Sequence, residues 1–172
     1  RSVRKYKDEK VDRETMREIV DIARWAPSWV NYQIARYTLV DDEEIIKEIA
    51  EHGVNGFVYN IDTLRTAKGV AVLSFVKGKS GTYDKEYITS KGNSWEVFDA
   101  GIACQTFCLA AHAKGVGTCI MGVIDDKSIA KIVNLPEDET VAALIVYGYE
   151  DGEHAAPNKR KDVDEIMRFV DR

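Results

Sequence analysis

The chain has 172 residues, a length that favours one domain, and its 45% hydrophobic and 31% charged residues exclude the composition of a disordered protein. The formal net charge is −5, whereas a general nucleic-acid binder needs a basic face that neutralises phosphates, so we expect no nucleic-acid partner. The apolar runs are too short for a membrane span and no secretory leader pattern opens the chain. We therefore expect a cytoplasmic protein without a membrane anchor.

Hydrophobic spacing and capping residues predict alternating helices and strands, without internal repeats or low-complexity linkers. In chain order the expected elements are a helix at 12–25, a strand at 36–40, a helix at 41–52, a short helix within 54–66, a strand at 69–76, a polar loop at 77–93, a helix at 95–114, a short strand or turn at 116–123, a helix at 125–133, a strand at 141–147 and a helix at 162–170. Asp12 and Asp41 are expected to cap the first two long helices, and Gly115 is expected to end the helix at 95–114 in the left-handed region.

The predicted helix at 95–114 is apolar around most of its circumference. A helix of this kind must be buried on nearly all sides. In a chain of this size it lies either at the centre of the domain or at a subunit interface, and the second possibility would make the protein a dimer.

Basic residues gather at the two ends of the chain. Residues 1–7 carry four cations and no acid, and Lys159, Arg160 and Lys161 form a second cluster, while the sequence between them is acidic. If the two ends meet in space, as the termini of single domains often do, they form one anion site. The alternative is that both clusters are solvated tails.

Several familiar sites are missing from the sequence. It contains no glycine-rich dinucleotide loop, phosphate-binding lysine loop, zinc-protease motif or hydrolase serine motif. Cys104, Cys108 and His112 share one helical stripe, but they spread over two turns without an evident fourth ligand, so we expect buried side chains and no metal. Three cysteines without a CxxC spacing do not indicate a disulfide framework.

Three remaining segments suit a flat, phosphorylated cofactor. Residues 1–4 offer guanidinium groups and a hydroxyl for a phosphate. The loop at 26–33 combines amides, a hydroxyl and aromatic rings, and the glycine-rich stretch at 115–122 allows backbone N–H groups to approach a ring closely.

In this order the segments resemble the nitroreductase family of FMN-dependent oxidoreductases. The opening Arg-Ser-Val-Arg-Lys-Tyr resembles the family's N-terminal signature, and Ala-Pro-Ser-Trp-Val-Asn-Tyr-Gln at 26–33 resembles the loop after its first helix. Asp-Ala-Gly-Ile-Ala-Cys-Gln at 99–105 and Gly-Val-Gly-Thr at 115–118 resemble its central helix and glycine turn, and 147–149 and 159–161 its final strand and closing phosphate site. The resemblance implies one domain over 1–172 with an α+β fold, in which helices flank a central mixed, mainly antiparallel sheet, and an intertwined homodimer with FMN at the interface.

The resemblance also implies roles for individual residues. Arg1, Ser2 and Arg4 would hold the FMN phosphate and ribityl chain, with Arg4 near the pyrimidine edge, and Arg160 with Lys159 or Lys161 would clamp the phosphate. The other implied flavin contacts are Pro27, Ser28, Trp29 and Asn31 toward the partner's flavin, Asn60, and the backbone of Thr118, Cys119, Ile120, Met121 and Gly122 toward N5 and O4. Trp29 stands where the family usually has a small residue, so we expect it to narrow the pocket over the flavin.

Such a protein would use NAD(P)H to reduce FMN and would then reduce a nitroaromatic, a quinone or a related acceptor in the same space by a ping-pong mechanism. The flavin supplies the hydride chemistry, and Arg4 would stabilise negative charge on N1 and O2. Two alternatives stay open at this point: a flavin-binding or redox-sensing protein without turnover, blocked by Trp29, and a cofactor-free interaction dimer whose basic ends are tails.

Overall fold

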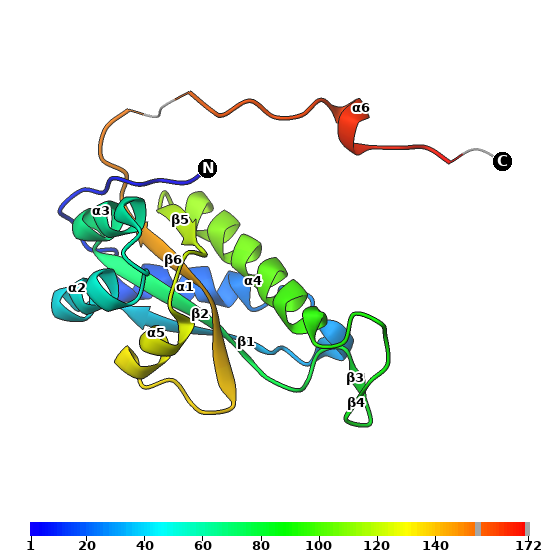
Figure 1. The fold of residues 1–172 in the computed structure, drawn as a ribbon. Helices are drawn as coiled ribbons and strands as arrows, with labels where there is room; N and C mark the ends of the chain where they lie inside the picture. Colours follow the sequence, from blue (N-terminus) through cyan, green and yellow to red (C-terminus); the bar gives the residue numbers. More distant parts are fainter. Residues whose placement is uncertain (154–155, 171–172) are drawn as a thin grey trace.

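A four-stranded antiparallel sheet forms the centre of the computed structural model, which describes residues 1–153 and 156–170 (Figure 1). Its strands are β1 (Ala35–Val40), β2 (Gly69–Val76), β6 (Glu139–Gly148) and β5 (Gly117–Met121), in that spatial order. Adjacent strands in this order all pair antiparallel. The parallel component of the expected mixed sheet is a bridge between Ser2 and Thr118.

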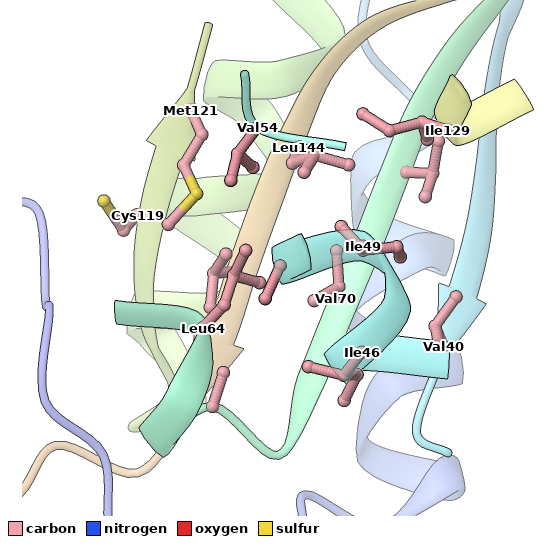
Figure 2. Close-up of a cluster of buried hydrophobic side chains, with 14 of the residues drawn as sticks. Val40, Ile46, Ile49, Val54, Leu64, Val70, Cys119, Met121, Ile129 and Leu144 are labelled. Atoms are coloured by element: carbon pink, nitrogen blue, oxygen red, sulfur yellow. The ribbon is translucent and has the colours of Figure 1, made fainter. Parts of the chain in front are cut away.

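Helices cover both faces of the sheet, and a small hairpin projects from one end (Figure 1). The remaining elements are α1 (Arg13–Ala23), the 3₁₀ turn η1 (Trp29–Asn31), α2 (Glu43–His52), α3 (Val58–Thr66), β3 (Thr82–Tyr83), β4 (Glu86–Tyr87), α4 (Ser94–Ala113), α5 (Asp126–Ile132) and α6 (Val163–Ile166). One core layer joins the sheet to α2, α3 and α5 (Figure 2), and a second joins it to α1 and α4. The expected α+β class is confirmed.

Strand β2 explains why this fold needs two apolar layers. Its side chains alternate, so that Val70 and Val72 enter the layer under α2 and α3 while Ala71 and Leu73 enter the layer under α1 and α4. A strand buried on both faces has no solvent-facing side, which is why 69–76 consists of small or apolar residues, and the hydroxyl of its polar residue Ser74 donates to Glu139.

The long helix α4 is not buried on nearly all sides by its own chain, so that prediction is wrong for a single copy. Phe107 and Ala111 are fully buried against the sheet, but Val97, Phe98 and Leu109 are exposed by 62%, 58% and 60%. An apolar face of this kind fits the second position expected for the helix, at a subunit interface.

The predicted positions of Asp12 and Gly115 at helix ends are confirmed, whereas α1 ends at Ala23 and not at Trp25, and the predicted cap of α2 is wrong. Asp12 caps α1 by accepting from the Thr15 N–H at 2.9 Å, and Gly115 follows α4 with φ +74°. The cap of α2 is Asp42, not Asp41, because the Asp41 carboxylate instead accepts two hydrogen bonds from the Arg13 guanidinium, at 2.7 and 2.9 Å.

The C-terminal helix is much shorter than expected. Asp162 and Glu165 do interact as in a capping box, since the Asp162 N–H donates to Glu165 Oε2 at 3.0 Å, but α6 ends at Ile166 and not at Val170. Residues 163–170 are exposed and extend away from the sheet (Figure 1). A single turn without a surface to pack on does not propagate, because helix formation is stabilised mainly by tertiary packing.

Within the ranges that the structure describes, no helix has both the length and the apolar character to cross a membrane. The cytoplasmic location stays a prediction.

Candidate cofactor site

The first seven residues lie along the outer end of β5 and the exit of β6. The Val3 N–H donates to the Thr118 carbonyl at 2.8 Å, and the Lys7 N–H donates to the Tyr149 carbonyl at 2.8 Å. A further bridge joins Tyr6 to Glu150. The basic N-terminal segment is therefore an added ribbon beside the glycine-rich strand, although the two are more than 100 residues apart in the sequence.

Two glycines allow this close approach. A Cβ atom on Gly117 would lie 2.7 Å from Val3 Cγ2, and one on Gly148 would lie 2.9 Å from Tyr6 Cδ1. The Tyr6 hydroxyl donates to the Val3 carbonyl at 2.6 Å, and burial raises the pKa of this phenol far above its ordinary value, so it remains a donor. The ribbon is thus fixed by packing as well as by the backbone.

The charges of this ribbon have acidic neighbours at the end of β6. Lys5 forms an ion pair with Asp151 at 2.7 Å, and Arg1 lies 4.0 Å from Glu150.

Burial raises the pKa of the Cys119 thiol, while the positive charge of Arg4 and a hydrogen bond with Ser2 oppose the rise. The predicted residues Ser2, Arg4 and Cys119 are therefore brought together.

A cleft of about 770 Å³ opens between this ribbon and the C-terminal half of α4. Its walls combine cations, hydroxyl and amide groups, and glycine backbone; the lining residues are Arg1, Ser2, Val3, Lys7, Gln105, Cys108, Leu109, His112, Gly115, Val116, Gly117, Thr118, Ile120, Tyr149, Glu150 and Gly152. Guanidinium, ammonium and hydroxyl donors suit a phosphate, and the apolar and glycine walls suit a flat ring. These residues fit a phosphorylated flavin, and Glu150 is the one carboxylate among them.

Strand β5 presents alternate residues to the two sides. Cys119 and Met121 are buried in the core layer under α2 and α3, where Figure 2 shows their side chains, whereas Ile120 is half exposed. Gly122 has open space where a Cβ would stand. A ligand on this strand would meet Thr118, Ile120 and backbone, and the contact of the backbone of 118–122 with a flavin stays a prediction.

Asn60 is tied to the end of the same strand. This residue of α3 is 9% exposed, and its Nδ2 donates to the Val123 carbonyl at 3.0 Å. The link connects the α3 layer to the residues that follow β5, so the predicted contact is placed near Gly122 in the chain, with its amide nitrogen already engaged.

The loop after α1 is held away from the N-terminal ribbon, at the other end of α4. Pro27 and Ser28 line a cleft of about 290 Å³ together with Asp99 and Ala103 of α4. The Trp29 indole does not project outward: its Nε1 donates to the Thr82 carbonyl at 3.1 Å, and its ring lies 5.0 Å from that of Trp95. Asn31 is exposed. One chain therefore does not unite this loop with Arg1, Ser2 and Arg4.

The second basic cluster also lies apart. Lys159, Arg160 and Lys161 are exposed on the segment that leaves the body of the molecule before α6 (Figure 1). Arg160 Nη1 donates to the Asn158 carbonyl at 2.8 Å. The convergence of the two basic ends stays a prediction, because the described chain carries them on separate segments.

Sequence reasoning missed two acids and the hairpin that they hold. Glu96 and Asp99, both in the first two turns of α4, are 4% exposed. Asp99 accepts from the Ser80 hydroxyl, and Glu96 accepts from the Gly78 N–H. The available signal was the presence of two acids in a helix that is otherwise apolar. No group of three or more His, Cys, Asp or Glu side chains in the described ranges is arranged to hold a metal ion.

The family model described as "Nitroreductase family" matches residues 1–149. A curated relative from Archaeoglobus fulgidus, "Putative NADH dehydrogenase/NAD(P)H nitroreductase", is 26% identical over 87% of this chain and 80% of its own length. An "FMN reductase [NAD(P)H]" from Bacillus subtilis is 31% identical over 87% of this chain and 62% of its own length. The solved structure of an "FMN-dependent Nitroreductase" from Clostridium difficile matches with a TM-score of 0.78 and 28% identity, covering 98% of this chain and 94% of that one. The chain therefore belongs to the nitroreductase family.

Proposed function

We propose that the protein is an FMN-dependent oxidoreductase that takes electrons from NAD(P)H and passes them to nitroaromatics, quinones or related acceptors. The observation that carries this proposal is the basic N-terminal ribbon fixed beside β5, with a phosphate-sized set of donors and a glycine wall around one cleft. The names of the relatives from Bacillus subtilis and Clostridium difficile support the same cofactor.

The chain's own residues would bind and orient the cofactor. Arg1 and Ser2 would hold the phosphate end, because both line the cleft beside Thr118. Arg4 would stabilise negative charge at the pyrimidine edge, and Thr118, Ile120 and the backbone to Gly122 would face the ring. When bound, FMN would supply the hydride chemistry.

We further propose that a second copy of the chain completes the site. The exposed face of α4 carries Val97, Phe98 and Leu109, and the C-terminal segment exposes Phe169 and Val170 by 81% and 93%. Two copies that pair along α4 and exchange their C-terminal segments would cover both surfaces. They would also bring loop 27–31 and cluster 159–161 of one protomer within reach of the other's cleft, as the family resemblance implies.

The dimer is tested by Val97→Lys, which places a charge on the exposed face of α4, because Val97 is 62% exposed and lies outside the candidate cleft. Val58→Lys is the matched control, because Val58 is equally exposed, at 61%, but lies on α3 at the opposite side of the sheet. Light scattering after size-exclusion chromatography should give a dimer for the parent and for Val58→Lys, and a monomer for Val97→Lys. A parent protein that is monomeric at micromolar concentration contradicts the dimer.

The cofactor and the reaction are tested by visible spectroscopy. The protein mixed with FMN and then gel-filtered should retain the flavin absorbance, and NADH or NADPH should bleach it within minutes. Arg4→Ala should weaken FMN binding by about tenfold or more, because a hydrogen bond to a charged group contributes about 1.5–3 kcal/mol. Lys47→Ala on α2 is the control, since Lys47 is exposed on another element. Loss of all flavin on the column rejects the proposal.

Turnover separates an enzyme from a flavin protein without turnover. With excess NAD(P)H and menadione or nitrofurazone, an enzyme consumes many equivalents of donor, whereas a protein without turnover stops after one. The enzyme is favoured because the Trp29 indole is engaged with Thr82 and Trp95, and so the side chain that was expected to block the pocket is folded back on its own chain.

A further inference from the structure

Two buried acids begin the long helix, and each one holds a different part of the chain. The Asp99 carboxylate accepts from the Trp29 N–H at 2.9 Å and from the Ser80 hydroxyl at 2.5 Å, both at Oδ2. Glu96 Oε1 accepts from the Gly78 N–H at 2.5 Å and from the Tyr87 hydroxyl at 3.4 Å. A carboxylate that is 4% exposed needs such partners, because an unpaired buried charge is strongly unfavourable.

The loop that Asp99 holds is strained. Val30, Asn31 and Gln33 have φ values of +46°, +56° and +49°. For a β-branched residue such as Val30 this conformation is a genuine outlier. Strained conformations of this kind persist only where the surrounding structure over-determines them, and they gather at functional sites. Loop 28–33 therefore needs an external support.

The hairpin at 77–93 is that support. The Trp29 Nε1–H donates to the Thr82 carbonyl at 3.1 Å, so the loop is bound to the hairpin by its side chain as well as through Asp99. The hairpin is packed tightly on α4: a Cβ on Gly81 would lie 2.9 Å from Trp95 Cδ1, and the Trp95 Nε1–H donates to Thr89 Oγ1 at 2.7 Å. Loop, hairpin and helix start form one unit around the Trp29–Trp95 pair.

We propose that Asp99 is the positioning residue that fixes loop 28–33 on this hairpin. In this unit Trp29 is the loop's anchor, and Val30 and Tyr32 are the side chains presented to the electron acceptor, since they are exposed by 70% and 42%. The acceptor part of the inference rests on the proposed function, in which this loop faces the partner's flavin. An aliphatic and an aromatic side chain suit a flat, apolar acceptor.

Amide hydrogen exchange on the FMN-free protein tests the positioning role without any activity. Asp99→Ala should speed exchange in 28–33 and 78–82 by about 10- to 150-fold, because a hydrogen bond to a charged acceptor contributes about 1.5–3 kcal/mol and 1.4 kcal/mol corresponds to a factor of ten. Asp99→Asn keeps an oxygen that can accept from both donors and should restore most of the protection. Ser128→Ala is the matched control, since it removes the same type of bond, from the Ser128 hydroxyl to Asp125 Oδ2, on α5.

Unchanged exchange in 28–33 of Asp99→Ala overturns the proposal. If Asp99→Ala does not fold, Ser80→Ala provides the test, because it removes only the hydroxyl donor at a side chain that is fully buried. Faster exchange in 78–82 of Ser80→Ala supports the link, and parent-like exchange there overturns it. The near-ultraviolet circular dichroism of the Trp29–Trp95 pair should weaken in Asp99→Ala and recover in Asp99→Asn.

Kinetics of the FMN-loaded protein test the anchor. Trp29→Phe keeps a ring but removes the donor to Thr82, so it should raise KM for all acceptors alike, with a smaller change in kcat. Val30→Ala and Tyr32→Ala should instead change the order of preference among acceptors of different size. The anchor assignment is overturned if Trp29→Phe changes the order of preference among acceptors while Val30→Ala and Tyr32→Ala leave it unchanged. Should the protein bind no FMN, the proposed function fails, while the exchange experiment still decides the role of Asp99.

Discussion

The hydroxyl of Tyr6 offers a direct test of how the N-terminal ribbon is held. Tyr6 is 4% exposed, and its single hydroxyl proton points at the Val3 carbonyl, 2.6 Å away, with the Val146 carbonyl at 3.3 Å. Tyr6→Phe removes this donor and leaves the ring in place. The carbonyl of Val3, a residue that is 6% exposed, then loses this donor.

The cost of this change follows from the structure. A buried acceptor left without its donor destabilises by about 1–3 kcal/mol. The backbone bonds of Val3 and Lys7 to the strand ends are unchanged, so the loss is expected in the local opening of residues 1–7 and only weakly in global unfolding. Exchange of the Val3 and Lys7 amides should therefore rise by roughly 5- to 150-fold, because 1.4 kcal/mol corresponds to a factor of ten.

Amide hydrogen exchange measured by NMR resolves these two amides, and Tyr37→Phe is the matched control. The Tyr37 hydroxyl also donates to a backbone carbonyl, that of Ala103 at 3.0 Å, but it joins β1 to α4. Parent-like exchange of Val3 and Lys7 in Tyr6→Phe, or an equal acceleration in Tyr37→Phe, refutes the reasoning. FMN affinity should fall less than protection does, because binding is reduced only by the fraction of molecules in which the ribbon is open.

Further predictions concern the core, the glycine contact and the acid limit of stability. Phe107→Ala, at a side chain that is fully buried and stacked on Tyr37, should lower the free energy of unfolding by about 3–5 kcal/mol in a denaturant titration. Gly117→Ala should displace Val3. The variant should therefore lose FMN on a desalting column, while its Tm stays close to that of the parent. The Arg13 guanidinium beside Asp41 holds the pKa of that carboxyl below its ordinary 3.8, so this pair stabilises the fold above that pH and the stability is lost as pH falls through the folded pKa. Asp41→Asn should therefore flatten the acid side of a plot of unfolding free energy against pH between 6 and 2.

The sequence predicted best what is decided within one element. The strand at 69–76 has the observed bounds because both of its faces are buried, and so every residue in it had to be small or apolar. The cap at Asp12 and the left-handed Gly115 were likewise predictable, because both depend on backbone groups a few residues away.

What depends on distant partners was predicted less well. Asp41 and Asp42 are equally good caps by sequence, and the choice is made by Arg13, which lies on α1 and engages Asp41. The role of Asp99 was hidden for the same reason: its donors are Trp29 and Ser80, which come from two different loops. No local spacing contains such a contact.

The candidate site also contains parts that could be predicted from the sequence and parts that depend on distant residues. Arg1, Ser2 and Arg4 could be grouped with Thr118 from residue types and family resemblance. The structure places Arg1, Ser2 and Thr118 around one cleft because Gly117 and Gly148 admit Val3 and Tyr6, whereas Arg4 acts on Cys119 and does not line that cleft. The placement of 159–161 is a different problem, since their segment carries the exposed residues Phe169 and Val170, which no surface of the same chain covers in the described ranges. Apolar side chains of this kind are covered when a partner is present. In the proposed dimer the phosphate clamp would be shared by two chains, so Val97→Lys, which should separate them, should weaken FMN binding although Val97 lies outside the cleft beside the N-terminal ribbon.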